Sequence, residues 1–171
     1  PEKYIDILKE YKSVTIGISI DSDVPAQLEY IRHKSHADKV FENLEKYKEL
    51  SKNFPNITPR ITLTVSIYNI FNLDDTVNNL KQHGLDISTN FVHRPEHYDI
   101  RHLPGPVKRI LSNRIQHIRA KKLLEQTLPG CDVLWPAFCQ EVALLDEIRN
   151  QKFADVFPDW YALLKPFMHD Q

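Results

Sequence analysis

VTIGISI, residues 14–20, decides the fold, because its large apolar side chains alternate with Thr, Gly and Ser. A period of two is typical of a β-strand with one buried face. ITLTVSI at residues 61–67 repeats the pattern, and residues 87–92 predict a third strand. Between these strands, residues 36–52 and 74–83 carry apolar side chains at helical spacing. Strands that alternate with helices predict parallel βαβ units, so the predicted fold class is α/β.

The remainder of the chain has a different pattern. Beyond Pro104, apolar stripes at helical spacing and an aromatic-rich end predict a helical tail. We therefore expect two parts, residues 1–104 with the strands and residues 105–171 as a helical C-terminal extension. Three strands are too few to close an eight-stranded barrel, so the predicted sheet is incomplete.

Composition excludes several classes of protein. The chain has 171 residues, of which 42% are hydrophobic, enough for one domain with a real core. Its four glycines cannot form a GxGxxG or P-loop motif. Because the chain shows neither a secretory leader pattern nor a long apolar run, we expect a cytoplasmic protein with no membrane contact. Cys131 and Cys139 fit neither a disulfide framework nor a close metal-binding pair.

Five segments, taken in order, carry a family resemblance. They are ISIDS (18–22), EYIR (29–32), TVSIYN (64–69), RHLPGPVK (101–108) and LDEIRNQKFADVFPDW (145–160). By their order and spacing they resemble the C-terminal half of a radical S-adenosylmethionine (radical SAM) enzyme. The group in question is the one whose barrel ends in a twitch or SPASM-like extension. The resemblance covers nearly the whole chain.

The resemblance implies a partial TIM-like barrel of six βα units, and this chain looks like about three of them, strands four to six. It also implies two cofactors in the parent family, S-adenosylmethionine and a four-iron four-sulfur cluster that cleaves it reductively. The cluster-binding CxxxCxxC motif is missing from these residues, and Ser22 stands where the family usually has glycine. We therefore expect the chain to be inactive alone and to bind neither cofactor tightly.

A cofactor site is also implied, at the ends of the first two strands. Ser19 matches a polar residue that hydrogen-bonds the amino-acid part of S-adenosylmethionine, and Arg32 matches a basic residue that meets its carboxylate. A guanidinium can bind a carboxylate with two hydrogen bonds, which suits this pairing. Asp21 belongs to the same group, with capping of the following turn as its alternative role. Ser66 and Asn69 approach the ribose or the substrate, or else hydrogen-bond within a turn.

The loop after the third strand supplies the expected substrate contacts, His93 and Arg94. Glu96 and further histidines nearby raise the alternative of a metal site. Pro95, however, interrupts any helix that would align the histidines as metal ligands. We expect no metal site in this loop.

Residues 101–122 hold seven Lys or Arg side chains and no carboxylate. Such a basic stripe could bind the phosphates of a nucleic acid. The favoured interpretation is a solvated helix face whose charges meet the acidic segment 141–159, so nucleic acid is not the expected partner. The alternative function is a non-catalytic α/β binding module that uses residues 101–122 for nucleic acid or a protein partner.

The expected absence of strands one to three predicts that the chain forms a homodimer. Without strands one to three, the edge of the strand at residues 14–20 has unpaired N–H and C=O groups. A second copy that meets this edge across a two-fold axis would form a homodimer. Alternatively, the helical tail folds back over the edge and the chain stays monomeric.

Overall fold

The computed structural model describes residues 2–168, which divide into two units. The first unit contains the described residues up to Thr64 together with Val77–Asn90, and the second contains Val65–Thr76 together with the described residues from Phe91 onward. The expected domain boundary at residue 104 falls inside the second unit and stays a prediction. Within residues 2–168, no helix has both the length and the hydropathy needed to cross a membrane.

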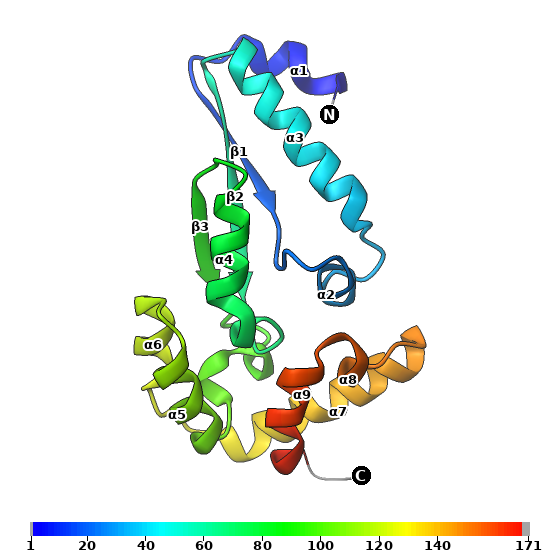
Figure 1. Cartoon of the computed structure of the whole chain (residues 1–171), viewed down its shortest axis with the longest axis vertical. Coiled ribbons are helices and arrows are strands. Elements are labelled where there is room, and N and C mark those ends of the chain that lie inside the picture. The colour runs from blue at the N-terminus through cyan, green and yellow to red at the C-terminus, as the bar shows by residue number, and fades with distance from the viewer. Residues whose placement is uncertain (1, 169–171) are drawn as a thin grey trace. The chain divides into compact units, whose positions relative to one another are not determined.

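The first unit is built from alternating helices and strands (Figure 1). In chain order the elements are α1 (Glu2–Lys9), β1 (Val14–Ser19), α2 (Pro25–Ile31), α3 (Ala37–Asn53), β2 (Ile57–Val65), α4 (Leu73–Lys81) and β3 (Ile87–Phe91). The last residue of β2, the last residue of β3 and the first turn of α4 belong to the second unit. The predicted strands and the helices between them are all present.

The strands form one parallel sheet in the order β1-β2-β3. The register of the first pair runs from Val14 opposite Ile57 to Ser19 opposite Thr62. The α/β class is thereby confirmed, whereas the partial barrel stays a prediction.

Strand β2 begins four residues before the predicted start at Ile61 and includes a proline, Pro59. Proline cannot donate to a sheet ladder, so its position needs a physical reason. Ile61 N–H bonds the carbonyl of Asp86, one residue before β3 begins. On the β3 side of β2, the backbone bonds therefore begin at Ile61. Pro59 lies before that point, so β3 has no residue there that needs a backbone N–H from Pro59.

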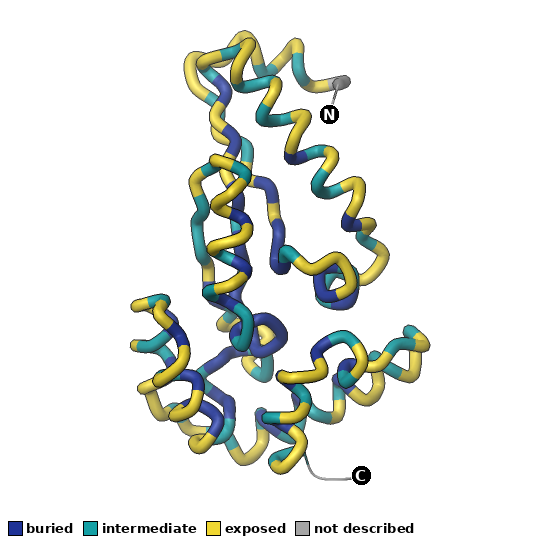
Figure 2. The backbone as a smooth tube through the Cα atoms, viewed as in Figure 1, coloured by how far each residue is buried: buried dark blue, intermediate teal, exposed yellow. Residues whose placement is uncertain are grey.

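The core of the first unit lies between the sheet and its helices. Leu44 of α3 and Leu80 of α4 pack in one cluster with Ile18, Ile20 and Ile61 of the β1 and β2 segments. Helix α3 exposes its other face to solvent, as the alternation along the tube in Figure 2 shows. Both connecting helices therefore cover the same face of the sheet.

The second unit is helical, as predicted for the tail. Its α-helices beyond α4 are α5 (Gly105–Arg114), α6 (Ile118–Leu124), α7 (Cys131–Arg149), α8 (Phe153–Val156) and α9 (Pro158–Leu164). Short 3-10 helices are η1 (Ile70–Asn72), η2 (Glu96–Tyr98), η3 (Ile100–His102) and η4 (Lys165–Phe167). The aromatic side chains form its core, where Tyr68 contacts the rings of Phe138 and Phe153. Trp160 is 1% exposed and donates its indole N–H to the carbonyl of Ile67.

Candidate functional site

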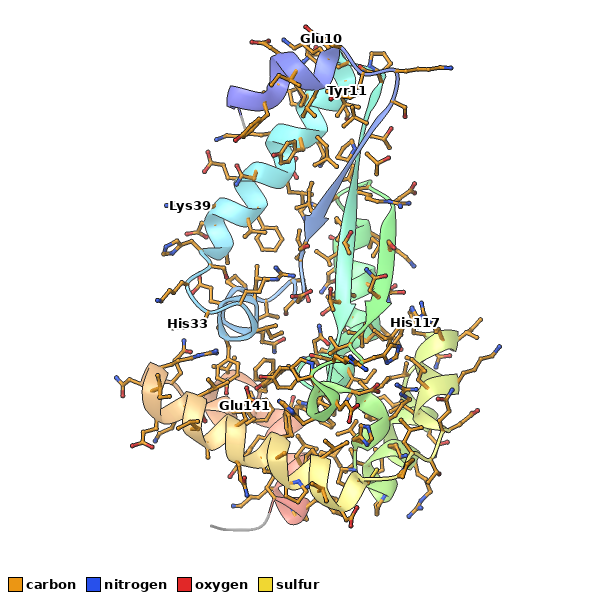
Figure 3. All side chains as sticks on the ribbon, turned by 180° about the vertical axis from the view of Figure 1, so that it is seen from behind. Glu10, Tyr11, His33, Lys39, His117 and Glu141 are labelled. Atoms are coloured by element: carbon orange, nitrogen blue, oxygen red, sulfur yellow. The ribbon has the colours of Figure 1, made fainter. Side chains whose placement is uncertain are left out.

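The face of the sheet opposite the core is polar. On β1, the residues Thr15, Gly17 and Ser19 are exposed, between apolar neighbours that face the helices. On β2, the side chains of Thr58 and Arg60 are likewise exposed. In Figure 3, which views the chain from behind, β2 and β3 lie in front of α4. The reader therefore looks directly at this polar face of the sheet. A sheet with one apolar face and one polar face can line a site for a polar ligand.

Asp21, just beyond the carboxyl end of β1, anchors the predicted cofactor residue Arg32. The Asp21 side chain is 5% exposed, and its Oδ2 accepts a hydrogen bond from Arg32 Nε at 2.6 Å. Its Oδ1 accepts from the backbone N–H of Thr64 at 3.0 Å, which ties the end of β1 to β2. The Arg32 side chain is 39% exposed. Asp21 therefore fixes the guanidinium through Nε, which leaves the two Nη groups as further donors.

Ser22 holds the turn that follows β1. Its hydroxyl accepts from the backbone N–H of Val24 at 3.1 Å and donates to Gln27 Oε1 at 3.0 Å. The serine is 1% exposed. A glycine could make neither side-chain bond, so the serine stabilises this turn.

Ser66 and Asn69 lie in the second unit, in the turn after β2. Asn69 Oδ1 accepts from the backbone N–H of Ser66 at 2.8 Å, and Ser66 Oγ accepts from the backbone N–H of Tyr68 at 3.3 Å. Both residues are buried. These bonds give the two residues a role in forming the turn, and Ser19, Asp21 and Arg32 belong to the other unit.

His93 lies beside Asp99, a residue that was not among the candidates from the sequence. His93 Nδ1 is 2.8 Å from Asp99 Oδ2, and Arg101 Nη2 is 2.6 Å from the same oxygen. The Asp99 side chain is 2% exposed, whereas 47% of the His93 side chain is exposed. The Arg101 backbone N–H also donates to Asp99 Oδ1 at 2.9 Å. Aspartate side chains often accept from the backbone N–H two residues later, so Asp99 could have been recognised in the sequence as a turn-forming residue. His93 is thus positioned and accessible, and Arg94 is exposed beside it.

Hydrogen bonding outweighs burial at Asp99. Burial alone would raise the pKa of this carboxyl group, but hydrogen bonds from Arg101 and His93 and the Arg101 charge hold the pKa below its ordinary value. Glu141 has two partners from η2. The Tyr98 hydroxyl donates to Glu141 Oε1 at 2.6 Å, and His97 Nε2 forms an ion-pair contact with Glu141 Oε2. Burial, with the hydrogen bond to Glu141, raises the pKa of Tyr98 to about 12.

The residues that the structure describes contain no group of three or more His, Cys, Asp or Glu side chains able to hold a metal ion. Of the candidates weighed from sequence, His93 is engaged with Asp99 and His97 with Glu141. Cys131 and Cys139 are free thiols on α7, and burial raises the pKa of Cys139 to about 11. Two cysteines on one helix do not fit a four-iron four-sulfur cluster.

The basic residues 101–122 do not meet the acidic segment as expected. Arg101 pairs with Asp99, and over residues 2–168 no ion pair joins 101–122 to 141–159. Instead, the Arg114 guanidinium lies 3.9 Å from the centre of the Phe71 ring, and the Arg119 guanidinium lies 5.0 Å from that of Phe91. The positive charge of α5 and α6 is therefore available to another molecule.

No protein-family model matches this chain, and neither a curated protein nor a solved structure matches it. Its function must therefore be argued from the chemistry of its own residues.

Proposed function

We propose that this chain is the C-terminal half of a radical SAM enzyme of the twitch or SPASM-like group, and that it supplies strands four to six of a partial TIM-like barrel. The observation that supports this is the parallel strand order β1-β2-β3, with α3 and α4 on one face. Barrels have sequential strands with all helices outside, whereas doubly wound sheets reverse their strand order and carry helices on both faces.

The polar face of the sheet supports a ligand-lining role. In a barrel this face points inward, where Ser19 and Arg32 would contact the amino-acid part of S-adenosylmethionine. Asp21 holds Arg32 by its Nε, so the Nη groups remain to bind the carboxylate of the ligand. Ser66 and Asn69 would shape the turn after β2, and the substrate contacts would be His93 and Arg94.

The iron-sulfur cluster does not fit the residues of this chain, as the two cysteines show. No step of the reaction is therefore assigned to these residues. Within the proposal, the chain alone is inactive and binds S-adenosylmethionine only weakly. A cytoplasmic location is part of the proposal, because both cysteines are free thiols. The proposal also includes a homodimer of this chain, formed through the outer edge of β1.

An NMR titration with S-adenosylmethionine tests the ligand assignment. We expect the backbone amide signals of Ser19, Asp21 and Arg32 to shift with a Kd of about 1 mM or weaker, which corresponds to about 4 kcal/mol of binding free energy. The Arg32→Lys variant keeps the positive charge but loses the paired, planar N–H donors of the guanidinium, and it should bind S-adenosylmethionine less tightly. Methylthioadenosine, which has no amino-acid part, is the matched control ligand and should leave these signals in place.

Two results would overturn the assignment. One is the absence of shifts at about 10 mM S-adenosylmethionine, far above the expected Kd. The other is an equal response to methylthioadenosine at the same amides. The family proposal has its own test, since the coding sequence upstream of the Pro1 codon should contain CxxxCxxC after a first strand.

A further inference from the structure

We propose that the surface of α5 and α6 binds the phosphate groups of a single-stranded nucleic acid. This proposal rests on the second unit alone and is independent of the radical SAM proposal. Its basis is a set of basic side chains that form no ion pair among the described residues, two of them lying over aromatic rings, beside a pocket with several polar side chains in its lining.

The charge of this surface is segregated from the rest of the chain. The whole sequence has a net charge of -1, yet residues 100–124 contain no carboxylate. Among the described residues, none of the side chains on α5 and α6 that make up this surface has an ion-pair partner; they are Arg109, Arg114, Arg119, Lys121 and Lys122. The Asp74 carboxylate lies close by, where it accepts from the backbone N–H groups of Gln116 and His117. Because the five basic side chains form no ion pair with it, the surface attracts polyanions.

Two arginines have their guanidinium groups over aromatic rings. Arg114 and Arg119 are exposed, and each lies over a phenylalanine ring, Phe71 or Phe91. A cation–π contact restricts the position of a guanidinium, while N–H groups that do not face the ring remain available. Two parallel N–H groups of a guanidinium can donate to two oxygens of one phosphate. These two side chains therefore lose less conformational freedom on binding than free surface arginines would.

A pocket of about 370 Å³ lies between the same helices. Its lining includes Lys108, Arg109, Ser112, Asn113 and Thr127. Lys108 is 8% exposed and donates to two backbone carbonyls, those of Arg101 and Gln126, at 3.1 and 2.8 Å. An ammonium group has three N–H donors, so one remains for a further acceptor. The other lining groups supply hydroxyl and amide donors that suit a phosphate.

The size of the pocket favours a single strand over a duplex. Ligand pockets of about 300 Å³ or more can take one small-molecule group such as a nucleotide. The phosphates of a duplex are fixed along a rigid helix, whereas a single strand can turn one nucleotide into a pocket. Glu125 also lines the pocket and would repel a phosphate there. The Glu125→Gln variant is therefore expected to bind more tightly than the unmodified chain.

Fluorescence anisotropy with a fluorescein-labelled twelve-nucleotide oligouridine tests the proposal. The double variant Arg114→Gln/Arg119→Gln should bind at least about tenfold more weakly at about 50 mM salt, with a salt slope smaller by about 0.7 for each phosphate that is no longer bound. The matched control is Lys46→Gln/Lys52→Gln on α3, which also removes two exposed positive charges. The control should bind like the unmodified chain. If the arginine variant fails to fold, Lys121→Gln/Lys122→Gln replaces it.

Several outcomes would overturn the proposal. One is the absence of an anisotropy change at about 100 μM chain, which is the weak end of non-specific nucleic-acid binding. Another is an equal loss of affinity in the α3 control. Competition by a polyaspartate peptide as effective as unlabelled oligouridine would assign the surface to acidic proteins instead. Tighter binding of a duplex of equal length would reject the single-strand preference.

Discussion

At the scale of single residues, Asp99 shows how hydrogen bonds can outweigh burial. Its carboxylate accepts from the backbone and side chain of Arg101 and lies beside His93. An ionised group that is hydrogen-bonded on both oxygens loses little on leaving water, and its protonated form would lose these partners. Asp99 therefore ties the loop after β3 together and sets the position of the exposed His93 ring.

The depressed pKa of Asp99 predicts a pH-dependent contribution to stability. A carboxyl group with a lower pKa in the folded state contributes stability above its unfolded pKa of about 3.9, and the contribution is lost as the pH falls through the folded value. Asp99→Asn should therefore lower the free energy of unfolding by about 2 kcal/mol at pH 7, because it leaves Arg101 without its partner. Urea unfolding at pH 7 and at about pH 3 measures this.

The difference between Asp99→Asn and the unmodified chain should shrink at the lower pH. At about pH 3 the Asp99 carboxyl group of the unfolded, unmodified chain binds a proton that folding must release, whereas the asparagine variant has no such group. Asp6→Asn is the control, because Asp6 forms an ion pair with Lys9 while its side chain is 91% exposed. That change should cost no more than about 0.5 kcal/mol. A difference for Asp99→Asn that stays constant across the pH range would contradict the role given to the carboxylate.

The half-buried thiol of Cys139 gives a second prediction at this scale. Burial raises its pKa to about 11, so about one thiol in a thousand is ionised at pH 8. In the Cys131→Ser variant, Cys139 should react with a disulfide reagent about 100-fold more slowly in the folded chain than in urea. Absorbance of the released thiolate measures both rates. Equal rates in the two conditions would refute the protected environment of Cys139.

At the scale of elements, the turn that follows α4 depends on one glycine. Gly84 has a φ of +72° three residues after the last helical residue, Lys81. A Cβ at Gly84 would meet nothing within 4 Å, so conformation alone opposes a side chain there. Gly84→Ala should lower the free energy of unfolding by about 1 kcal/mol.

Gly105→Ala is the matched control for Gly84→Ala. Gly105 begins α5 without a positive φ, and a Cβ at this residue would have Arg109 Nη1 as its nearest neighbour, at 3.9 Å. Alanine restricts the unfolded chain and favours the helix, so stability should stay equal or rise by about 0.5 kcal/mol. Urea unfolding followed by circular dichroism distinguishes the two variants. Equal losses in both would show that the sign of φ does not control the effect of the substitution.

Elements with a clear period were predictable from sequence, and contacts between distant residues were not. Alternation in VTIGISI indicated β1, because a half-buried strand imposes a period of two. The start of β2 at Ile57 was missed, because Pro59 is tolerated only where no neighbouring strand needs its N–H. The bond from Arg32 to Asp21 and that from Asp99 to His93 depend on loop paths that no local pattern encodes. Arg32 was named from sequence only as a cofactor ligand that the family resemblance implies, which stays a prediction, and Asp99 was not named.

At the scale of the whole molecule, the outer edge of the sheet is where the proposed homodimer would form. The order β1-β2-β3 makes β1 an edge strand. Val14 N–H bonds Asn56 and Ile20 N–H bonds Thr62, so the even-numbered residues of this segment pair with β2. The N–H groups of Thr15 and Gly17 then point to the outer side, where a second copy can accept hydrogen bonds. A two-fold axis at this edge would pair β1 with itself.

The edge contact predicts a dimer that a single proline abolishes. Light scattering coupled to size exclusion should give twice the 20.1 kDa mass of one chain at micromolar concentration. Thr15→Pro removes one outward N–H, while the bonds of Val14 and Ile20 to the β2 side remain, so the mass should fall to that of one chain without loss of the fold. Thr15→Ala keeps the N–H and should remain dimeric. A single-chain mass for the unmodified protein, with slow amide exchange at Thr15 and Gly17, would instead mean that the edge is already covered within one chain.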